Sequence, residues 1–189
     1  MSGIYDASLF LITTLFDLYL FVLAIRVLLA YSGANYYDPA IQFIVRLTDV
    51  AVKPLRRIIP NIQGIEISTL LLILALEFVK YFLITSIGSM PVSIIGIIII
   101  AFADSLKLFL LTFFYSIIAQ AILSWVQPMS PVIMLLYRIN APIMRPIQRL
   151  VPNVGGMDIS PIPAIILLQL TIILIVNPLM ALGLGASLG

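Results

Sequence analysis

The chain has 189 residues, of which 62% are hydrophobic and 10% are charged, and its net charge is +2. Soluble domains are roughly 45–50% apolar and about 25% charged, and a mean hydropathy of +1.21 lies far outside their range. The composition excludes a soluble globular protein, a disordered chain and a nucleic-acid binder, so nucleic acid is not an expected partner. It indicates a membrane protein that crosses the bilayer several times.

The chain contains no cysteine and no histidine. It therefore has no disulfide, no cysteine zinc site, no iron–sulfur cluster and no imidazole ligand for zinc or haem. Ser-His-Asp and Cys-His catalysis are excluded by composition. We predict a protein that is not an enzyme, with no catalytic residues, no metal site and no cofactor.

Four apolar segments are long enough to cross a bilayer as helices, which takes about 20 residues. They lie at about 8–31, 68–88, 105–126 and 160–182. No Lys or Arg precedes Arg26, so the first segment lacks the positive start of a cleaved signal peptide and should be retained.

The third of these spans begins inside a longer apolar stretch, residues 91–126, which is interrupted only by Asp104 and Lys107. One continuous helix over this stretch would measure on the order of 54 Å, which is too long for a single span. We therefore expect residues 91–103 to form a short re-entrant or interfacial segment. The alternative is a fifth, thin span.

Basic residues gather in the two segments that follow the first and third spans. They are Arg46, Lys53, Arg56 and Arg57 in the first segment and Arg138, Arg145 and Arg149 in the second. Four spans place both segments on the same side, whereas five would separate them, so we favour four. The positive-inside rule then predicts that this side is cytoplasmic and that both termini lie outside.

The two basic segments are copies of each other at an offset of 92. Residues 54–68 read PLRRIIPNIQGIEIS and residues 146–160 read PIQRLVPNVGGMDIS. The repeated turn motif consists of Pro60, Asn61, Gly64, Glu66 and Ser68 in the first copy and Pro152, Asn153, Gly156, Asp158 and Ser160 in the second. The chain is therefore predicted to be an all-α duplication, with repeats at 1–88 and 105–189 and a connector at 89–104. Each repeat is a span, an amphipathic helix and a span, and an even number of spans makes the repeats parallel.

Within the turn, Glu66 and Asp158 each stand two residues before a serine that can cap the next span. A carboxylate there faces the positive end of a helix dipole and lies near Arg57 or Arg149. The motif predicts a helix cap with a salt bridge, or else a functional carboxylate.

The first basic segment has the spacing of an amphipathic helix. Its polar residues, spaced by four, three, four and three, are Gln42, Arg46, Asp49, Lys53 and Arg56. Such a helix lies in the membrane interface with its apolar face toward the acyl chains, and Pro54, Pro142 and Pro146 should kink or interrupt the two copies. It is either an anchor that fixes topology or a binding surface for anionic lipid or a partner protein.

Three charged residues fall inside the predicted spans, namely Asp17, Glu77 and Lys80. Glu77 and Lys80 are three residues apart and can pair on one helix face. Asp17 lies at a matching depth and can pair with Lys80 between helices. Charges inside hydrocarbon are costly, so these residues form either a buried polar network or an ion or proton pathway.

The repeated signature P-x-x-R-x-[IV]-P-N-x-x-G-x-[DE]-I-S between two spans resembles the YggT (YlmG-like) family of small bacterial and plastid membrane proteins. The resemblance covers nearly the whole chain and implies a multi-pass protein of the bacterial inner membrane. Family members are linked to cell or plastid division and nucleoid distribution, to potassium uptake under osmotic stress, and in one plastid branch to haem attachment on cytochrome b. The resemblance implies no agreed biochemical activity.

Two functions remain open on this basis. The first is a non-enzymatic membrane protein that organises anionic lipid or a membrane-protein partner through its basic helices, in cell division or complex assembly. The alternative is a potassium transporter or channel in osmotic adaptation, which with four spans would need an oligomer to form a pore.

Overall fold

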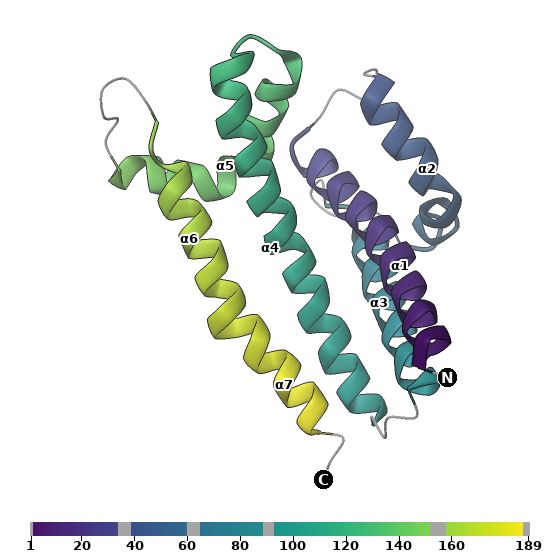
Figure 1. The fold of residues 1–189 in the computed structure, drawn as a ribbon. Coiled ribbons are helices and arrows are strands. Elements are labelled where there is room, and N and C mark those ends of the chain that lie inside the picture. The colour runs from purple at the N-terminus through teal and green to yellow at the C-terminus, as the bar shows by residue number, and fades with distance from the viewer. Residues whose placement is uncertain (1, 34–38, 60–64, 89–92, 152–157, 187–189) are drawn as a thin grey trace.

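A computed structural model of the chain describes residues 2–33, 39–59, 65–88, 93–151 and 158–186. These residues form helices with short connections (Figure 1). In chain order the helices are α1 (Ser2–Tyr31), α2 (Pro39–Arg56), α3 (Ile67–Ile87), α4 (Ile94–Val126), α5 (Pro131–Leu150), α6 (Pro161–Thr171), the π-helical turn η1 (Ile172–Val176) and α7 (Asn177–Gly185).

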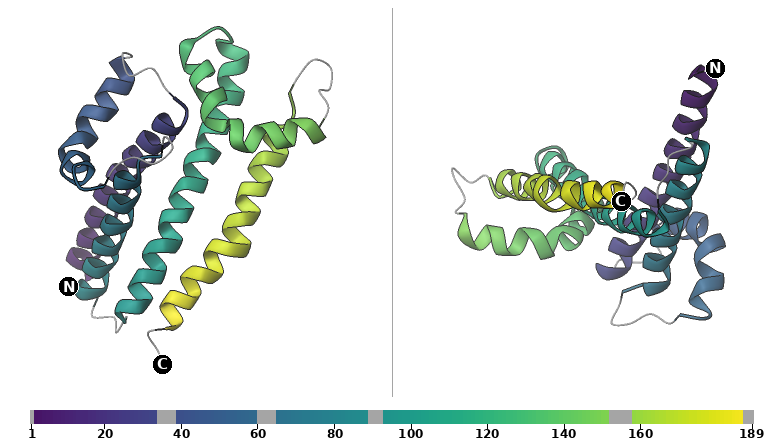
Figure 2. Two further views of the ribbon diagram at one scale, coloured as in Figure 1. Left: turned by 180° about the vertical axis from the view of Figure 1, so that it is seen from behind. Right: turned by 90° about the horizontal axis from the view of Figure 1, so that it is seen from below.

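Four helical segments are long and apolar enough to cross a membrane: Gly3–Tyr31, Ile67–Ile87, Ile94–Val126 and Pro161–Gly185. The fourth is built from α6, η1 and α7 in succession. The segments alternate in direction, so that both termini lie at one end of the bundle and α5 and the start of α2 lie at the other (Figures 1 and 2). The predicted all-α fold with four transmembrane helices is confirmed.

The third span is longer than we expected. A separate re-entrant or interfacial segment at 91–103 is wrong for the described residues, because 94–103 form the start of α4. The Ser93 hydroxyl caps this helix by accepting a hydrogen bond from the Gly96 backbone N–H at 3.1 Å. As a result Asp104 and Lys107 lie inside the helix and not at its outer end.

Close packing against α7 explains why the start of α4 continues the third span. Gly183 of α7 approaches α4 so closely that a Cβ there would lie 2.6 Å from Ile100 Cγ1 and 2.9 Å from the Gly96 carbonyl oxygen. The Ser93 hydroxyl also donates to the Ala186 carbonyl at 3.1 Å. Contact with α7 therefore stabilises α4 as far as its first turn. The apolar run in the sequence could not reveal this contact.

Prolines bend two helices without ending them. α5 contains Pro142 and Pro146 and changes direction along its length, from beside α4 to across the start of α6 (Figures 1 and 2). In the fourth span, Pro178 follows directly after the π-helical turn and Asn177. Proline lacks a backbone N–H and its ring crowds the preceding turn, so the helix around it bends or widens.

The faces of α2 and α5 that pack on the bundle use equivalent positions of the two copies. Ile41 and Val52 are buried in α2, and Ile133 and Met144, each 92 residues later, are buried in α5. None of the four side chains is more than 4% exposed. The equivalence is what a duplication predicts, whereas the borders of the repeats at 1–88, 89–104 and 105–189 stay a prediction.

Candidate functional site

α2 presents three different faces. The first packs on the bundle through Ile41, Thr48 and Val52. The second is apolar yet 46–83% exposed, and its residues are Phe43, Leu47, Val50 and, just beyond the helix, Ile58. The third is basic and exposed, and its residues are Arg46, Lys53, Arg56 and Arg57. An exposed apolar stripe beside a basic one is typical of a helix at a membrane surface.

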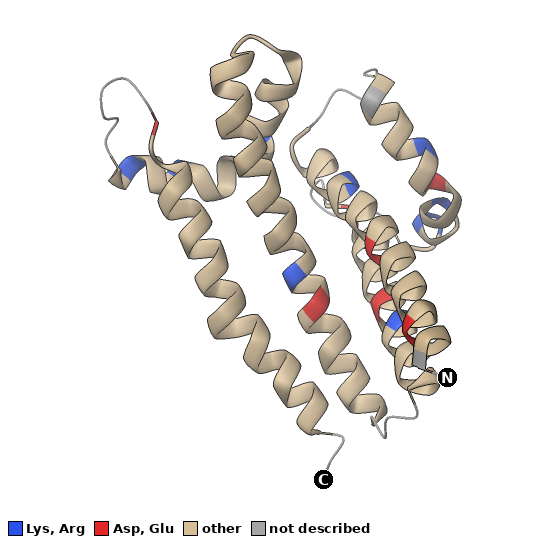
Figure 3. Cartoon of the chain, viewed as in Figure 1, with Lys and Arg blue, Asp and Glu red and all other residues tan. Residues whose placement is uncertain are grey.

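The basic residues of α5 have no partner among the described residues. Arg138, Arg145 and Arg149 are exposed and make no hydrogen bond or ion pair with any residue that the structure describes. On α2, by contrast, Lys53 reaches Asp49 at 3.0 Å and Arg56 lies 3.8 Å from Glu66. Figure 3 shows basic residues on α2 and α5, and no charged residue on α6 or α7.

Arg26 joins the first span to α2 and to the start of α3. Its side chain is 2% exposed, and its Nε donates to Glu66 Oε2 at 2.7 Å. Its Nη1 donates to Thr48 Oγ1 at 2.7 Å and to Asp49 Oδ1 at 2.8 Å. Glu66 was expected to lie near Arg57, but its main partner is Arg26.

The charge on Asp49 is stabilised by this junction. Partial burial acts to raise the pKa of the Asp49 carboxyl, but hydrogen bonds and charge from Arg26 and Lys53 lower it below its ordinary value. Asp49 is therefore ionised throughout the neutral pH range and holds Arg26 in place. Because Asp49 also pairs with Lys53, α2 has fewer unpaired charges than its sequence suggests.

The second repeat has an uncharged junction at the same place. A two-residue gap before the basic segments aligns RVLLAY (26–31) with QAILSW (120–125), so Gln120 corresponds to Arg26. Asn140 corresponds to Thr48 at the offset of 92. The Asn140 side-chain amide donates to Gln120 Oε1 at 2.9 Å, and the Ser116 hydroxyl donates to Asn140 Oδ1. Both repeats thus fasten their amphipathic helix to the preceding span by buried hydrogen bonds.

The turn motif is described only in part. Pro60, Asn61, Gly64, Pro152, Asn153 and Gly156 lie outside the described residues. The remaining two carboxylates behave differently from each other. Glu66 is buried against Arg26, whereas Asp158 accepts hydrogen bonds from the Ser160 backbone N–H at 2.9 Å and from the Gln148 amide at 2.8 Å.

The two serines of the motif do not cap the spans as we expected. The Ser68 and Ser160 hydroxyls are buried and have no hydrogen-bond partner among the described residues. Asp158 provides the capping contact in the second copy. Partial burial acts to raise the pKa of its carboxyl, but the hydrogen bonds that it accepts from the Ser160 backbone N–H and the Gln148 amide lower it. The preference of serine for N-caps was outweighed because both serines point into the bundle.

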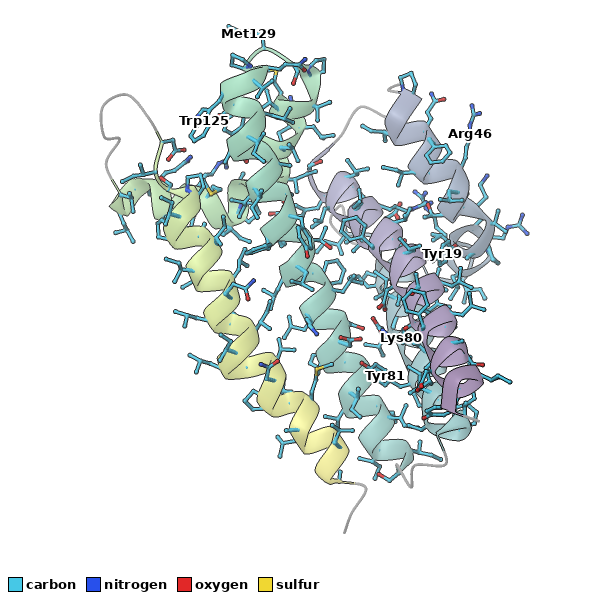
Figure 4. All side chains as sticks on the ribbon, viewed as in Figure 1. Tyr19, Arg46, Lys80, Tyr81, Trp125 and Met129 are labelled. Carbon is cyan, nitrogen blue, oxygen red and sulfur yellow. The ribbon has the colours of Figure 1, made fainter. Side chains whose placement is uncertain are left out.

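A cluster of charges lies among α1, α3 and α4. The Lys80 ammonium is 2.9 Å from Asp17 Oδ1, 2.6 Å from Glu77 Oε2 and 2.8 Å from Asp104 Oδ2. The Tyr81 hydroxyl also donates to Asp104, at 3.0 Å. Figure 4 shows Lys80 and Tyr81 midway along the spans. The predicted contacts of Lys80 with Asp17 and Glu77 are therefore present.

Sequence reasoning missed Arg26 and Asp104 as members of these networks. The available signal was that each is a charge within or beside an apolar span and so needs a partner. The partner of each residue could not be found from sequence spacing, because Glu66 is 40 residues from Arg26 and Lys80 is 24 residues from Asp104. Among the described residues, no group of three or more carboxylates is placed to hold a metal ion.

Comparison with known proteins identifies the duplication independently. The CCB3/YggT family model matches residues 5–87 and, a second time, residues 97–179. An uncharacterised protein of Pseudomonas aeruginosa is 38% identical over 96% of this chain and 94% of its own length. The protein YggT of Escherichia coli K12, also uncharacterised, is 34% identical over 92% of each chain. No solved structure matches.

Proposed function

The chain belongs to the CCB3/YggT family, and on that premise we propose that it is a non-enzymatic protein of the bacterial inner membrane that organises anionic lipid, or a membrane-protein partner, at one membrane surface. Cell division or the assembly of a membrane complex is the process we infer for it. The relatives are named as uncharacterised proteins, so their names support no activity.

The observation that carries this proposal is the three-faced α2. Its packed face holds the helix on the bundle, which leaves Phe43, Leu47 and Val50 for the acyl region and the basic face for headgroups. Each Lys or Arg near an anionic leaflet contributes about 1 kcal/mol. Lys53 and Arg56 already face Asp49 and Glu66. Arg46 and Arg57, which have no ion pair among the described residues, therefore contribute roughly 2 kcal/mol together. α5 supports the same conclusion with three arginines that have no ion pair with any described carboxylate.

A reconstitution experiment tests the lipid preference. The full chain is placed in bilayers that mix phosphatidylethanolamine with phosphatidylglycerol, and energy transfer from Trp125 or an attached dye to labelled phosphatidylglycerol reports enrichment around the protein. We expect enrichment to fall when Arg46, Lys53, Arg56 and Arg57 are all changed to Gln. The control changes Arg46, Arg56 and Arg57 to Lys, which retains charge and should retain enrichment. Equal enrichment in the Gln variant would overturn the proposal.

The orientation is tested separately. We infer that the basic helices face the cytoplasm and that the termini face outward, from the positive-inside rule. Because the chain lacks cysteine, the single-cysteine variants Lys53→Cys and Gly185→Cys give unambiguous labelling. An impermeant maleimide applied to intact cells without their outer membrane should label position 185 and spare position 53. The reverse pattern would invert the topology.

Ion transport is a second candidate, favoured by one specific observation. The Lys80 cluster brings three carboxylates to a single ammonium among three spans, and Lys80 and Glu77 are only 3% and 1% exposed. Potassium flux into liposomes that hold the purified chain tests it, with Glu77→Gln as the variant and Glu77→Asp as the charge-conserving control. Flux that Gln abolishes and Asp retains supports transport, whereas no flux from the unaltered protein eliminates this candidate.

A further inference from the structure

Two adjoining cavities lie beside α5. One has a volume of about 450 Å³ and is lined by Arg138, Arg145 and Arg149 together with Tyr31 and Ser32 from the end of α1. The other has a volume of about 700 Å³ and is mainly apolar. Arg138 lines both, so the two cavities are neighbours at this residue.

The apolar cavity separates the two repeats. α1 and α2 of the first repeat contribute Ile25, Leu28 and Ile44, and α4 and α5 of the second contribute Ala119 and Leu135. Its size is that of an ordinary ligand site, which is about 300–1,000 Å³. A cavity with walls of this kind is a poor site for water and a good one for hydrocarbon.

Two of the polar side chains in that wall, Thr112 and Ser116, are already engaged. The Thr112 hydroxyl donates to the Leu108 carbonyl at 2.7 Å. The Ser116 hydroxyl contacts Asn140, as described for the second junction. Apart from Arg138 and the Tyr115 hydroxyl, the remaining lining is apolar and suits an acyl chain better than a polar ligand.

The basic cavity has the opposite character. Three guanidinium groups line it, and none of the described residues in its lining is a carboxylate. Since these arginines have no ion pair among the described residues, they are available for an anion from outside the chain. Guanidinium groups bind phosphate oxygens through two parallel hydrogen bonds, which makes arginine the preferred residue for phosphate recognition.

We propose that the two cavities together hold one anionic phospholipid, with its phosphate on Arg138, Arg145 and Arg149 and an acyl chain between the repeats. The inference rests on the proposed function, because it names a defined lipid site within the membrane-surface role. A lipid in this position contacts both repeats and helps to set the distance between α1 and α4. It differs from the diffuse attraction of α2, since one molecule is bound in one place.

Native mass spectrometry of the full chain in a non-ionic detergent tests this site. We add phosphatidylglycerol, or phosphatidylethanolamine with the same acyl chains, and count the lipids retained. One phosphatidylglycerol should be retained preferentially, and Arg138→Gln with Arg145→Gln should weaken its binding at least tenfold, as expected for lost charge-assisted hydrogen bonds. Glycerol 3-phosphate, which carries the phosphate without acyl chains, should bind at least tenfold more weakly than the lipid.

Two further variants separate this site from the basic face of α2. Ala119→Phe reduces the volume of the apolar cavity without changing any charge, and it should also lower retention. Arg46→Gln with Arg57→Gln removes two positive charges from α2, and it should leave retention unchanged. Thermal melting without added lipid shows that each variant is folded.

The outcomes distinguish this inference from the proposed function. Retention equal in the Arg138/Arg145 variant and the unaltered protein would overturn the site, as would the absence of any retained lipid. If bilayer enrichment by α2 persists in either case, the proposed function stands without the site. If enrichment fails while one lipid is still retained, the site stands without the broader role.

Discussion

Replacing Arg26 by Gln should destabilise the first repeat more than any other single change in its polar contacts. The side chain is 2% exposed and donates to Glu66, Thr48 and Asp49. Gln fits at this position, since the second repeat carries Gln120 at the corresponding place. The variant therefore isolates the loss of the charge from a steric effect.

The expected magnitude follows from the burial of both partners. Glu66 is 3% exposed, so losing Arg26 leaves a buried carboxylate whose remaining counter-charge is the exposed Arg56 at 3.8 Å. Removing one member of a buried pair costs about 3–5 kcal/mol. For a chain of this size each kcal/mol corresponds to about 2–4 °C in Tm, so the melting temperature should fall by roughly 6–20 °C.

The double variant Arg26→Gln with Glu66→Gln provides the decisive comparison. It removes both charges, and we expect it to regain more than half of the loss because no uncompensated carboxylate remains. Thermal melting in detergent gives Tm, and backbone hydrogen exchange should show faster opening of α2 in the single variant. A single variant as stable as the unaltered protein, or a double variant that shows the sum of both losses, would refute this reasoning.

Three further changes test other contacts. Gly183→Ala places a Cβ 2.6 Å from an α4 side chain and should cost about 1–3 kcal/mol in a melting experiment, whereas Gly185→Ala, with open space around it, should be nearly neutral. Ser93→Ala removes the cap of α4 and should lower the free energy of unfolding by about 1 kcal/mol. The control Ser8→Ala removes only an exposed hydrogen bond within α1 and should change the free energy of unfolding less. Because the pKa of Asp158 is lowered in the folded chain, its stabilising contribution is present above the ordinary aspartate pKa of about 3.9 and is lost as pH falls through the folded value. Melting curves of Asp158→Asn should therefore lack the part of the acid destabilisation that the unaltered protein shows below about pH 4; an identical pH dependence would contradict this.

The spans and the amphipathic helices were predictable because each depends on local composition or spacing. A run of apolar residues is sufficient to indicate a membrane span. The polar spacing of four, three, four and three is sufficient to predict α2. The duplication was equally plain, since an exact offset of 92 between two copies needs no structure to detect.

The path of α4 was not predictable in the same way. Its start is stabilised by contact with Gly183, which lies more than 80 residues later in the chain. Length alone favoured two separate pieces, because a helix of this size exceeds one bilayer thickness. The third partner of Lys80 was missed for the same reason: Asp104 was placed at a membrane surface, while α4 holds it 2.8 Å from the ammonium.

The two repeats have divided their charges differently, and this division explains where binding should occur. The first repeat uses Arg26 and Asp49 to fasten α2, and its spans contain Glu77 and Lys80. In the second repeat Gln120 and Asn140 fasten α5 without charge. The junction of the second repeat contains no carboxylate, so it provides no counter-charge for an arginine of α5. The α5 arginines accordingly pair with no described carboxylate, and they line the basic cavity beside the apolar one between the repeats.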